Sequence, residues 1–292
     1  MRIDLHTHSR ASDGTETPAE LVAGARAAGL DVLAITDHDT AAGWDEAADA
    51  ARSAGIELVR GMEISTTHRG HSVHLLAYLP DPTYPPLVAE LDAVLEGRRA
   101  RVPEMLSRLR DLGIDIDADD VRRAARGTAA TGRPHIADAL VTKGVVADRT
   151  EAFDRYLGAG RPAHVSRYAA ELVDVLGHVT SAGGVSVIAH PWGRSRRRFP
   201  DLDDLAELRG HGLAGIEVDH QDHDAATRAE LRGLARELDL VITGASDHHG
   251  AGKVDHDLGV NTTHPDEYAR LLDLAAIASA RSGRPTPEVV RP

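Results

Sequence analysis

Asp4-Leu5-His6-Thr7-His8 sets two histidines one residue apart, directly after a short apolar run that begins at residue 1. Alternate residues of an extended strand point to the same side, so both imidazoles can reach one metal ion where the strand ends. Four other hydrophobic runs also end in metal-seeking side chains: Asp37-His38-Asp39, Gly61-Met62-Glu63, Ala189-His190-Pro191 and Ser246-Asp247-His248-His249. A single His-x-His pair is weak evidence of a metal site, whereas five such endings in one chain are strong evidence.

Short apolar segments alternate with helical patterns on both sides of the middle of the chain. Thr17-Pro18-Ala19-Glu20 begins one such helix, because it combines an N-cap, a proline in the first turn and a following acid. We expect helices at about 17–29, 41–54, 169–182 and 224–238, and strands at 1–6, 32–35, 56–59, 73–77, 185–188, 215–218 and 240–243. This alternation implies parallel βαβ units, and about seven strands predict a closed or nearly closed β/α barrel.

The middle of the chain differs from both flanks. From about residue 96 to residue 162 it is charged and has helical patterns, with Gly, Asp and Pro breaks and no convincing strand. We therefore expect an inserted helical cap over 96–165 that separates two parts of the barrel, 1–95 and 166–292. The alternative is that this segment only extends the outer helical ring, but the short loops usual in plain α/β units favour the insertion.

The composition is that of a globular chain rich in small aliphatic residues. Of its 292 residues, 42% are hydrophobic, 27% are charged and only 3% are aromatic, which favours helices packed on strands. The formal net charge of -13 argues against a broad surface for duplex nucleic acid, whereas a small anionic substrate held by metal ions is compatible with it. No run approaches transmembrane length and the start lacks the apolar segment of a signal peptide, so we expect a cytoplasmic protein.

The chain contains no cysteine. This excludes a disulfide framework, a thiolate zinc site and a cysteine nucleophile. Any metal must therefore be held by imidazole and carboxylate groups, a ligand set that suits Mn, Fe, Zn or Mg better than softer ions.

A barrel would gather the candidate ligands at one face. The carboxyl ends of the strands of a β/α barrel converge there, and active sites are built from them. Seven candidates lie at or just beyond such ends: His6, His8, His38, Glu63, His190, Asp247 and His249. Any one histidine is usually only a solvated loop residue, and this chain has 17. The convergence of so many positions is what favours a metal site.

Two further candidates have good alternative explanations. Asp13 lies in a polar Ser-Asp-Gly turn, where turn formation explains it as well as metal binding does. His74 lies near the start of its strand, where a ligand fits only if that strand runs against its neighbours. Four nearby residues are expected to support the ligands or to be exposed: Asp37, Asp39, His248 and His256.

The five motifs, in this order along nearly the whole chain, resemble those of the PHP (polymerase and histidinol phosphatase) family of metallo-phosphoesterases. The resemblance implies a distorted TIM-like (β/α)₇ barrel that holds two to three divalent metal ions. The implied ligand sets are His6, His8, Glu63 and Asp247 for one ion, Glu63, His74 and His190 for a second, and Asp13, His38 and His249 for a third. Asp13 and His74 thereby become expected ligands.

The middle segment is similar to the insertion of bacterial PHP phosphatases that act on nucleotides. The similarity lies in three stretches, Thr131-Gly132-Arg133-Pro134-His135-Ile136-Ala137, Ala152-Phe153-Asp154-Arg155-Tyr156-Leu157-Gly158 and Gly160-Arg161-Pro162-Ala163-His164-Val165. It implies removal of phosphate from 3′,5′-nucleoside bisphosphates or nucleoside monophosphates, and related members trim short RNA from 5′ to 3′. Arg133 and His135 would reach the substrate phosphate from the cap. His248 departs from the pattern, which has an aromatic residue there, and this departure bears on base or sugar packing.

Clustered metal ions suit phosphoester hydrolysis, because they activate water, bind the nonbridging phosphate oxygens and stabilise the leaving alkoxide. We expect in-line attack on phosphorus by a metal-bridging hydroxide. Arg133 offers a planar fork that matches phosphate oxygens, and its alternative role is that of a solvated arginine at a helix start. His135 could donate a hydrogen bond to the phosphate or protonate the leaving group.

Two other basic groups have simpler explanations. Arg98, Arg99 and Arg101 could face the pocket, but a charged helix face is more often solvated. Four arginines lie on an expected surface loop beside the active face, where they could recruit a longer polyanion: Arg194, Arg196, Arg197 and Arg198.

The leading hypothesis is a metal-dependent phosphatase acting on a nucleotide. Histidinol-phosphate phosphatase is an alternative that the cap disfavours, and a 5′-3′ exoribonuclease on short RNA is one that the acidic surface disfavours. A non-catalytic metal-binding module would be expected to have lost ligands, and every motif position here carries a competent side chain. The sequence predicts a small phosphorylated partner and no membrane, and it identifies no protein partner.

Overall fold

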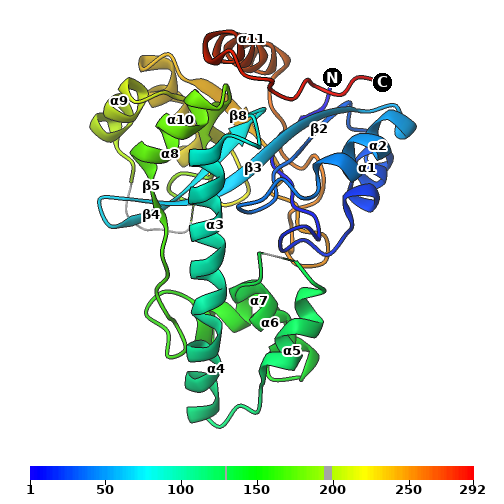
Figure 1. Cartoon of the computed structure of the whole chain (residues 1–292), viewed down its shortest axis with the longest axis vertical. Coiled ribbons are helices and arrows are strands. Elements are labelled where there is room, and N and C mark those ends of the chain that lie inside the picture. Colours follow the sequence, from blue (N-terminus) through cyan, green and yellow to red (C-terminus); the bar gives the residue numbers. More distant parts are fainter. Residues whose placement is uncertain (129, 194–198) are drawn as a thin grey trace.

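The structure, a computed structural model, describes residues 1–128, 130–193 and 199–292 (Figure 1). Its strands form one sheet in the order β1-β2-β3-β4-β6-β7-β8, and β5 pairs with β3 beside this path. They span Ile3–Asp4 (β1), Val32–Ile35 (β2), Glu57–His68 (β3), His71–Tyr78 (β4), Ala170–Glu171 (β5), Val185–Ile188 (β6), Leu213–Asp219 (β7) and Val241–Gly244 (β8). A bridge between Thr7 and His248 brings the two ends of the sheet together, so the barrel is nearly closed, as predicted.

One strand of the barrel runs against its neighbours. β4 pairs antiparallel with β3 and with β6, whereas the pairs β1–β2, β2–β3, β6–β7 and β7–β8 are parallel. The first half of β4 therefore lies where the parallel strands finish, and His74 pairs with Ser65 of β3. The position of His74 near the start of its strand, which the sequence left open, is explained by this reversal.

In the part of the chain that the structure describes, seven helices lie along the barrel: α1 (Pro18–Ala27), α2 (Trp44–Ala54), α3 (Pro85–Ala100), α8 (Leu172–Ser181), α9 (Leu202–Gly210), α10 (Ala225–Glu237) and α11 (Pro265–Ser282). The predicted start of α1 is confirmed, because Thr17 Oγ1 accepts from the Glu20 amide at 3.1 Å and the Glu20 carboxylate accepts from the Thr17 amide at 2.8 Å. The sequence did not predict α9 and α11. Among the described residues, no helix combines the length and apolar character needed to cross a bilayer.

The hydrophobic core has a layer on each side of the sheet. Val32 and Ala34 of β2 belong to the cluster inside the barrel, whereas Leu33 and Ile35 belong to the cluster between the sheet and the helices. Because both faces of the strand are buried, its apolar run is continuous and does not alternate. α11 contributes Tyr268 and other side chains to the inner cluster and lies at the end of the molecule opposite the helices of residues 102–152 (Figure 1).

The middle of the chain forms a helical lobe, which we define as residues 102–165. It contains α4 (Val102–Asp111), α5 (Ala118–Ala125), α6 (Arg133–Thr142), α7 (Arg149–Ala152) and the π-helix η1 (Phe153–Leu157), and its described residues include no strand. The lobe has its own buried cluster around Met105 and Leu140. α3 begins on the barrel and passes the predicted boundary at residues 95 and 96 to reach the lobe (Figure 1). The division into domains stays a prediction.

Candidate metal centre

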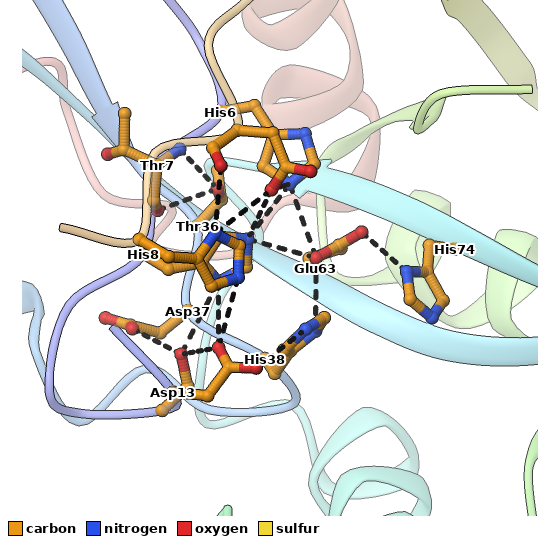
Figure 2. Close-up of polar contacts among 12 residues, drawn as sticks. His6, Thr7, His8, Asp13, Thr36, Asp37, His38, Glu63 and His74 are labelled. Atoms are coloured by element: carbon orange, nitrogen blue, oxygen red, sulfur yellow. Dashed lines mark hydrogen bonds and ion pairs between the residues drawn. The ribbon is translucent and has the colours of Figure 1, made fainter. Parts of the chain in front are cut away.

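Nine histidines and carboxylates meet at the end of the barrel where most strands finish. They are His6, His8, Asp13, His38, Glu63, His74, His190, Asp247 and His249, and all are buried except the half-buried His74 and His190. Glu63 lies within β3 and His74 within β4, while the others follow β1, β2, β6 and β8. Figure 2 shows His6, His8, His38 and His74 around Glu63. The chain thus brings together every residue that the sequence singled out as a candidate ligand.

The first group contains four donor atoms spaced as ligands of one ion. His6 Nε2 and His8 Nε2 lie 3.0 Å apart, and they lie 3.3 and 3.1 Å from Glu63 Oε2. Each of these nitrogens is also 3.5 Å from Asp247 Oδ1. Ligands in a tetrahedral shell around an ion such as Zn²⁺ are separated by about 3.4 Å. This set therefore fits a divalent ion.

The second group uses the other oxygen of Glu63. His74 Nδ1 lies 2.7 Å from Glu63 Oε1, and His190 Nε2 lies 3.0 Å from the same oxygen. Glu63 thus presents one oxygen to each of two groups of imidazoles. This is the arrangement of a carboxylate that can bridge two ions.

The third group lies around Asp13. His38 Nε2 is 3.6 Å from Asp13 Oδ2, and His249 Nε2 is 3.4 Å from Asp13 Oδ1. His8 also belongs to this cluster through its second nitrogen, which the sequence did not foresee. His38 Nδ1 lies 3.1 Å from Glu63 Oε2 but is buried without a hydrogen-bond partner. An orphaned nitrogen beside a carboxylate is expected where a cation binds.

The backbone around the site is shaped for this convergence. A Cβ on Gly14 would lie 2.3 Å from the carbonyl oxygen of His8, so only glycine lets the loop after Asp13 fold back on this segment. His190 and Asp247 have positive φ angles of 29° and 53°. Such backbone strain in residues other than glycine is typical of functional sites.

The surroundings set the protonation states of the candidate ligands. Burial opposes a charge on His8, but hydrogen bonds with Asp247 and Glu63 outweigh it and raise the pKa of His8 to about 9. Burial lowers the pKa of His249 to about 4 and that of His38 to about 3. Most ligand groups are therefore already in the deprotonated state that metal binding requires. Despite burial, the carboxylates around His6 raise its pKa as well, so on both His6 and His8 an ion would replace a proton.

Glu217 of β7 supports two of the candidate ligands. His6 Nδ1 lies 3.2 Å from Glu217 Oε1, and the amide of His190 donates to Glu217 Oε2 at 2.8 Å. The carboxylate is fully buried; burial raises its pKa, but the charge of His6 outweighs this and lowers it to about 2. Glu217 therefore stays ionised and fixes the His6 ring so that Nε2 faces the site.

We expect Glu217→Gln to weaken metal binding by about 10- to 100-fold, because removal of the partner of a ligating histidine typically has this effect. The variant keeps the shape of the side chain, so the fold should persist. Metal affinity can be measured by titrating chelator-treated protein, with Glu230→Gln of α10 as the matched control. Unchanged affinity in Glu217→Gln would contradict the supporting role.

Asp247 is held by a second set of basic groups. The ring nitrogen Nδ1 of His220 accepts from the amide of Asp222 at 3.0 Å, so we assign the proton to Nε2, which donates to Asp247 Oδ2 at 3.2 Å. Lys253 also contacts this oxygen. Oδ2 is thus occupied by protein donors, while Oδ1 faces His6 and His8.

His248 is bound away from the candidate ligands, whereas a ring nitrogen of His256 lies within 4.8 Å of ligand atoms of Asp247 and His220. His248 Nδ1 donates to the carbonyl oxygen of His256 at 2.8 Å, and its Nε2 lies 3.0 Å from Glu16 Oε2. His256 Nδ1 donates to the carbonyl oxygen of Ser246 at 2.6 Å. Asp37 and Asp39 also support the site, because Asp37 binds Ser9 and Ser12 and Asp39 binds Arg98 and Ser65.

His135 fastens the lobe to the loop that carries Asp13. Its Nδ1 accepts from the Gly132 amide at 3.1 Å, so Nε2 carries the proton and donates to the carbonyl oxygen of Ser12 at 3.2 Å. Arg149 Nη1 donates to the carbonyl oxygen of Asp13 at 2.9 Å. Arg133 begins α6, and its guanidinium lies 5.3 Å from the centre of the Phe153 ring. The predicted basic loop with Arg194, Arg196, Arg197 and Arg198 lies outside the described residues.

The sequence missed three residues that act on the ligands: Glu217, His220 and Lys253. Glu217 had one signal, an acid in the middle of a fully apolar strand, which is costly unless the carboxylate is paired. His220 follows the end of β7 and obeys the same strand-end rule as the ligands. Lys253 lies in an irregular segment and gave no signal.

Solved structures show the class to which this site belongs. A candidate metal-dependent phosphoesterase from Bifidobacterium adolescentis is 38% identical and superposes with a TM-score of 0.89 over 93% of this chain and 96% of its own. A β/α barrel that gathers histidines and carboxylates at its strand ends defines, together with this match, a metal-dependent phosphoesterase.

Comparison of sequences then gives the family. A model of the PHP domain matches residues 4–113. The chain is 36% identical to the 3′,5′-nucleoside bisphosphate phosphatase of Chromobacterium violaceum over 88% of its length and 90% of that protein. It is 37% identical to a 5′-3′ exoribonuclease of Haemophilus influenzae over 85% of its length and 90% of that protein. The chain belongs to the PHP family of metal-dependent phosphoesterases.

Proposed function

We propose that this enzyme removes phosphate from a nucleotide, either a nucleoside 3′,5′-bisphosphate or a nucleoside monophosphate. The observation that carries the proposal is the metal centre, in which Glu63 presents one oxygen to each of two imidazole groups. The similarity to a nucleoside bisphosphate phosphatase over nearly nine-tenths of both chains supports a nucleotide as the substrate.

The proposed centre holds two to three divalent ions. The proposed ligand sets are His6, His8, Glu63 and Asp247 for the first ion, Glu63, His74 and His190 for the second, and Asp13, His38 and His249 for the third. The close grouping of His6, His8 and Glu63, and that of His8, Asp13, His38 and His249, support the first and third sets. Imidazole and carboxylate ligands suit Mn, Fe, Zn or Mg. Bound divalent ions lower the pKa of water, bind the nonbridging oxygens of a phosphate and stabilise a leaving alkoxide.

The helical lobe supplies the proposed substrate contacts. Arg133 presents a guanidinium, whose planar fork matches two phosphate oxygens. His135 Nε2 donates a hydrogen bond to the carbonyl oxygen of Ser12, and this bond must break before Nε2 can donate to a phosphate or to a leaving oxygen of the substrate. In this assignment the lobe acts as a substrate cap over the barrel.

We expect phosphate release from adenosine 3′,5′-bisphosphate and AMP to exceed that from histidinol phosphate by at least about tenfold in kcat/KM, since a tenfold preference needs only about 1.4 kcal/mol of differential binding. The assay measures inorganic phosphate at one metal concentration for all substrates. Preference for histidinol phosphate would overturn the nucleotide assignment and leave the phosphoesterase class intact.

A second candidate, trimming of short RNA, is favoured by a basic cleft beside His135. The cleft has a volume of about 360 Å³ and lies between the loop after β1 and helices α5 and α6. Its basic side chains are Arg10, Arg123, Arg126, Lys143 and Arg149, against two acids, Asp120 and Asp138. A 5′-phosphorylated oligonucleotide in the same assay decides whether this cleft serves a longer polyanion.

A further inference from the structure

Side chains of the helical lobe bind a row of backbone carbonyls in the loop after β1. The carbonyl oxygens of residues 11, 12 and 13 each accept a hydrogen bond from a lobe side chain, in this order: Thr128 at 2.6 Å, His135 at 3.2 Å and Arg149 at 2.9 Å. Loops are usually more mobile than the elements that they connect, so this row of contacts restrains a segment that would otherwise move. The last carbonyl of the row belongs to the candidate ligand Asp13.

Arg149 is itself fixed in place by Asp138. Its Nε and Nη2 donate to the two carboxylate oxygens of Asp138 at 2.6 and 2.7 Å, a two-pronged geometry that orients the guanidinium plane. The side chain of Arg149 is only 12% exposed. Burial opposes its charge, but the hydrogen bonds with Asp138 outweigh burial and raise the pKa of Arg149. Nη1 is therefore a charged donor that Asp138 aims at the Asp13 carbonyl.

The same nitrogen packs against the loop after β8. A Cβ on Gly252 would lie 2.4 Å from Arg149 Nη1 and 2.7 Å from its Cζ, and Arg149 cannot give way while Asp138 holds it. Glycine is the residue that lets the backbone approach the guanidinium this closely. The Gly252 amide donates to the carbonyl oxygen of His249 at 3.2 Å. The contact with Arg149 thus reaches the segment that carries a second candidate ligand.

The two loops are also bound to each other, and we call residues 11–15 and 249–252 the paired loops. The Thr15 amide donates to the carbonyl oxygen of His249 at 3.1 Å, and the Ala251 amide donates to Thr15 Oγ1 at 2.9 Å. Asp13 Oδ1 and His249 Nε2, which the paired loops carry, lie 3.4 Å apart. Arg149 contacts both loops, so its position bears on both ligands.

The ligands proposed for the second ion have a different support. Glu63 and His74 lie within strands, and His190 follows β6. Sites on strands are held more firmly than sites on loops, because the sheet fixes the backbone. Asp13 lies in an irregular loop well beyond the end of β1, where its backbone needs support from outside the sheet.

We propose that Arg149 is a positioning residue for the third ion: from the helical lobe it holds the paired loops so that Asp13 and His249 lie at the separation that this ion requires. The inference rests on the proposed metal centre and adds to it a residue that is not a ligand. Removal of a group that orients a metal ligand typically weakens metal binding by about 10- to 100-fold. Because the second site depends on the sheet, the effect should be confined to one ion.

The first test measures metal affinity in Arg149→Ala, with Arg155→Ala as the matched control. Arg155 lies in the same lobe, but its side chain is 50% exposed and paired with Glu151. Titration of the chelator-treated full chain with Zn²⁺ should show one site weakened by about 10- to 100-fold in Arg149→Ala and none weakened in Arg155→Ala. Unchanged affinity at every site of Arg149→Ala would overturn the positioning role.

Asp13→Asn separates failure of this inference from failure of the proposed function. It should lose the same site that Arg149→Ala weakens. If Asp13→Asn loses one ion while Arg149→Ala binds every ion as the wild type does, the metal centre stands and the role of Arg149 is contradicted. If Asp13→Asn also keeps every ion, the third site of the proposed centre is contradicted as well.

A second test separates positioning from a general loss of stability. Guanidinium ion at millimolar concentration should bind beside Asp138 in the space left by Arg149→Ala and restore the weakened site, and it should not change Arg155→Ala. Asp138→Asn should weaken the same site, and its combination with Arg149→Ala should add little, because the two side chains act as one unit. Weakened metal binding that guanidinium does not restore, together with a lower Tm of the metal-free chain, would show a structural role and overturn the proposal.

Discussion

Glu63→Gln should lower phosphate release by about a thousandfold or more, because loss of several kcal/mol of transition-state stabilisation by metal ions corresponds to at least three powers of ten. Glu63 is the residue that the geometry makes least replaceable. Its Oε2 lies within 3.3 Å of His6 Nε2 and His8 Nε2, and its Oε1 lies within 3.0 Å of His74 and His190. An amide keeps the shape but loses the charge.

The matched control for this variant is Glu57→Gln. Glu57 begins the same strand at its other end, where its carboxylate binds the hydroxyl of Tyr268. This change should alter stability slightly and leave metal content and kcat unchanged. Metal content is measured by elemental analysis, and Glu63→Gln should lose two ions while Asp13→Asn loses one. Full activity in Glu63→Gln would contradict the proposed metal centre.

Removal of the metal ions should abolish activity and lower stability together. Chelator-treated protein should lose at least about a thousandfold in rate and recover on addition of Mn²⁺, Fe²⁺, Zn²⁺ or Mg²⁺. Each ion that binds only the folded chain raises its Tm by roughly 4 °C at a hundredfold excess over its Kd. Calorimetry of metal-free and reloaded protein measures this difference.

The inactive variant provides the control for metal removal. Glu63→Gln should show a smaller change in Tm on chelation than the wild type, because it has fewer ions to lose. Metal-free protein that retains full activity would show that hydrolysis does not depend on this centre. An equal change in Tm for both proteins would show that the ions bind elsewhere.

Strand-end motifs predicted the candidate ligands because barrel geometry determines where a residue after a strand must lie. His6 and His190 are far apart in the sequence, yet both follow a strand, and their rings lie 5.7 Å apart. To place His74 at the site from the sequence, one would have to know that β4 runs antiparallel to its neighbours. That direction depends on the pairing of distant strands and not on the local sequence pattern. Glu217 was missed because it lies within a strand and its partner, His6, is far away in the sequence, so no local motif links the two residues.

The arginines at the end of α3 show where interpretation of a charged helix failed. We interpreted Arg98, Arg99 and Arg101 together as a solvated face, and this was wrong for two of them. Arg98 and Arg101 are three residues apart and share one side of the helix, whereas Arg99 points to solvent. The face that is covered depends on how the lobe folds back, which the local sequence does not encode.

The contacts between lobe and barrel have a thermodynamic consequence. His135 and Arg149 bind the carbonyls of Ser12 and Asp13, so the loop that presents Asp13 cannot move independently of the lobe. Occupancy at Asp13 and docking of the lobe are therefore linked equilibria, and by reciprocity each strengthens the other by the same factor. A cation bound at Asp13 would therefore favour docking of the lobe, and a substrate that favours docking of the lobe would raise the affinity of Asp13 for that cation.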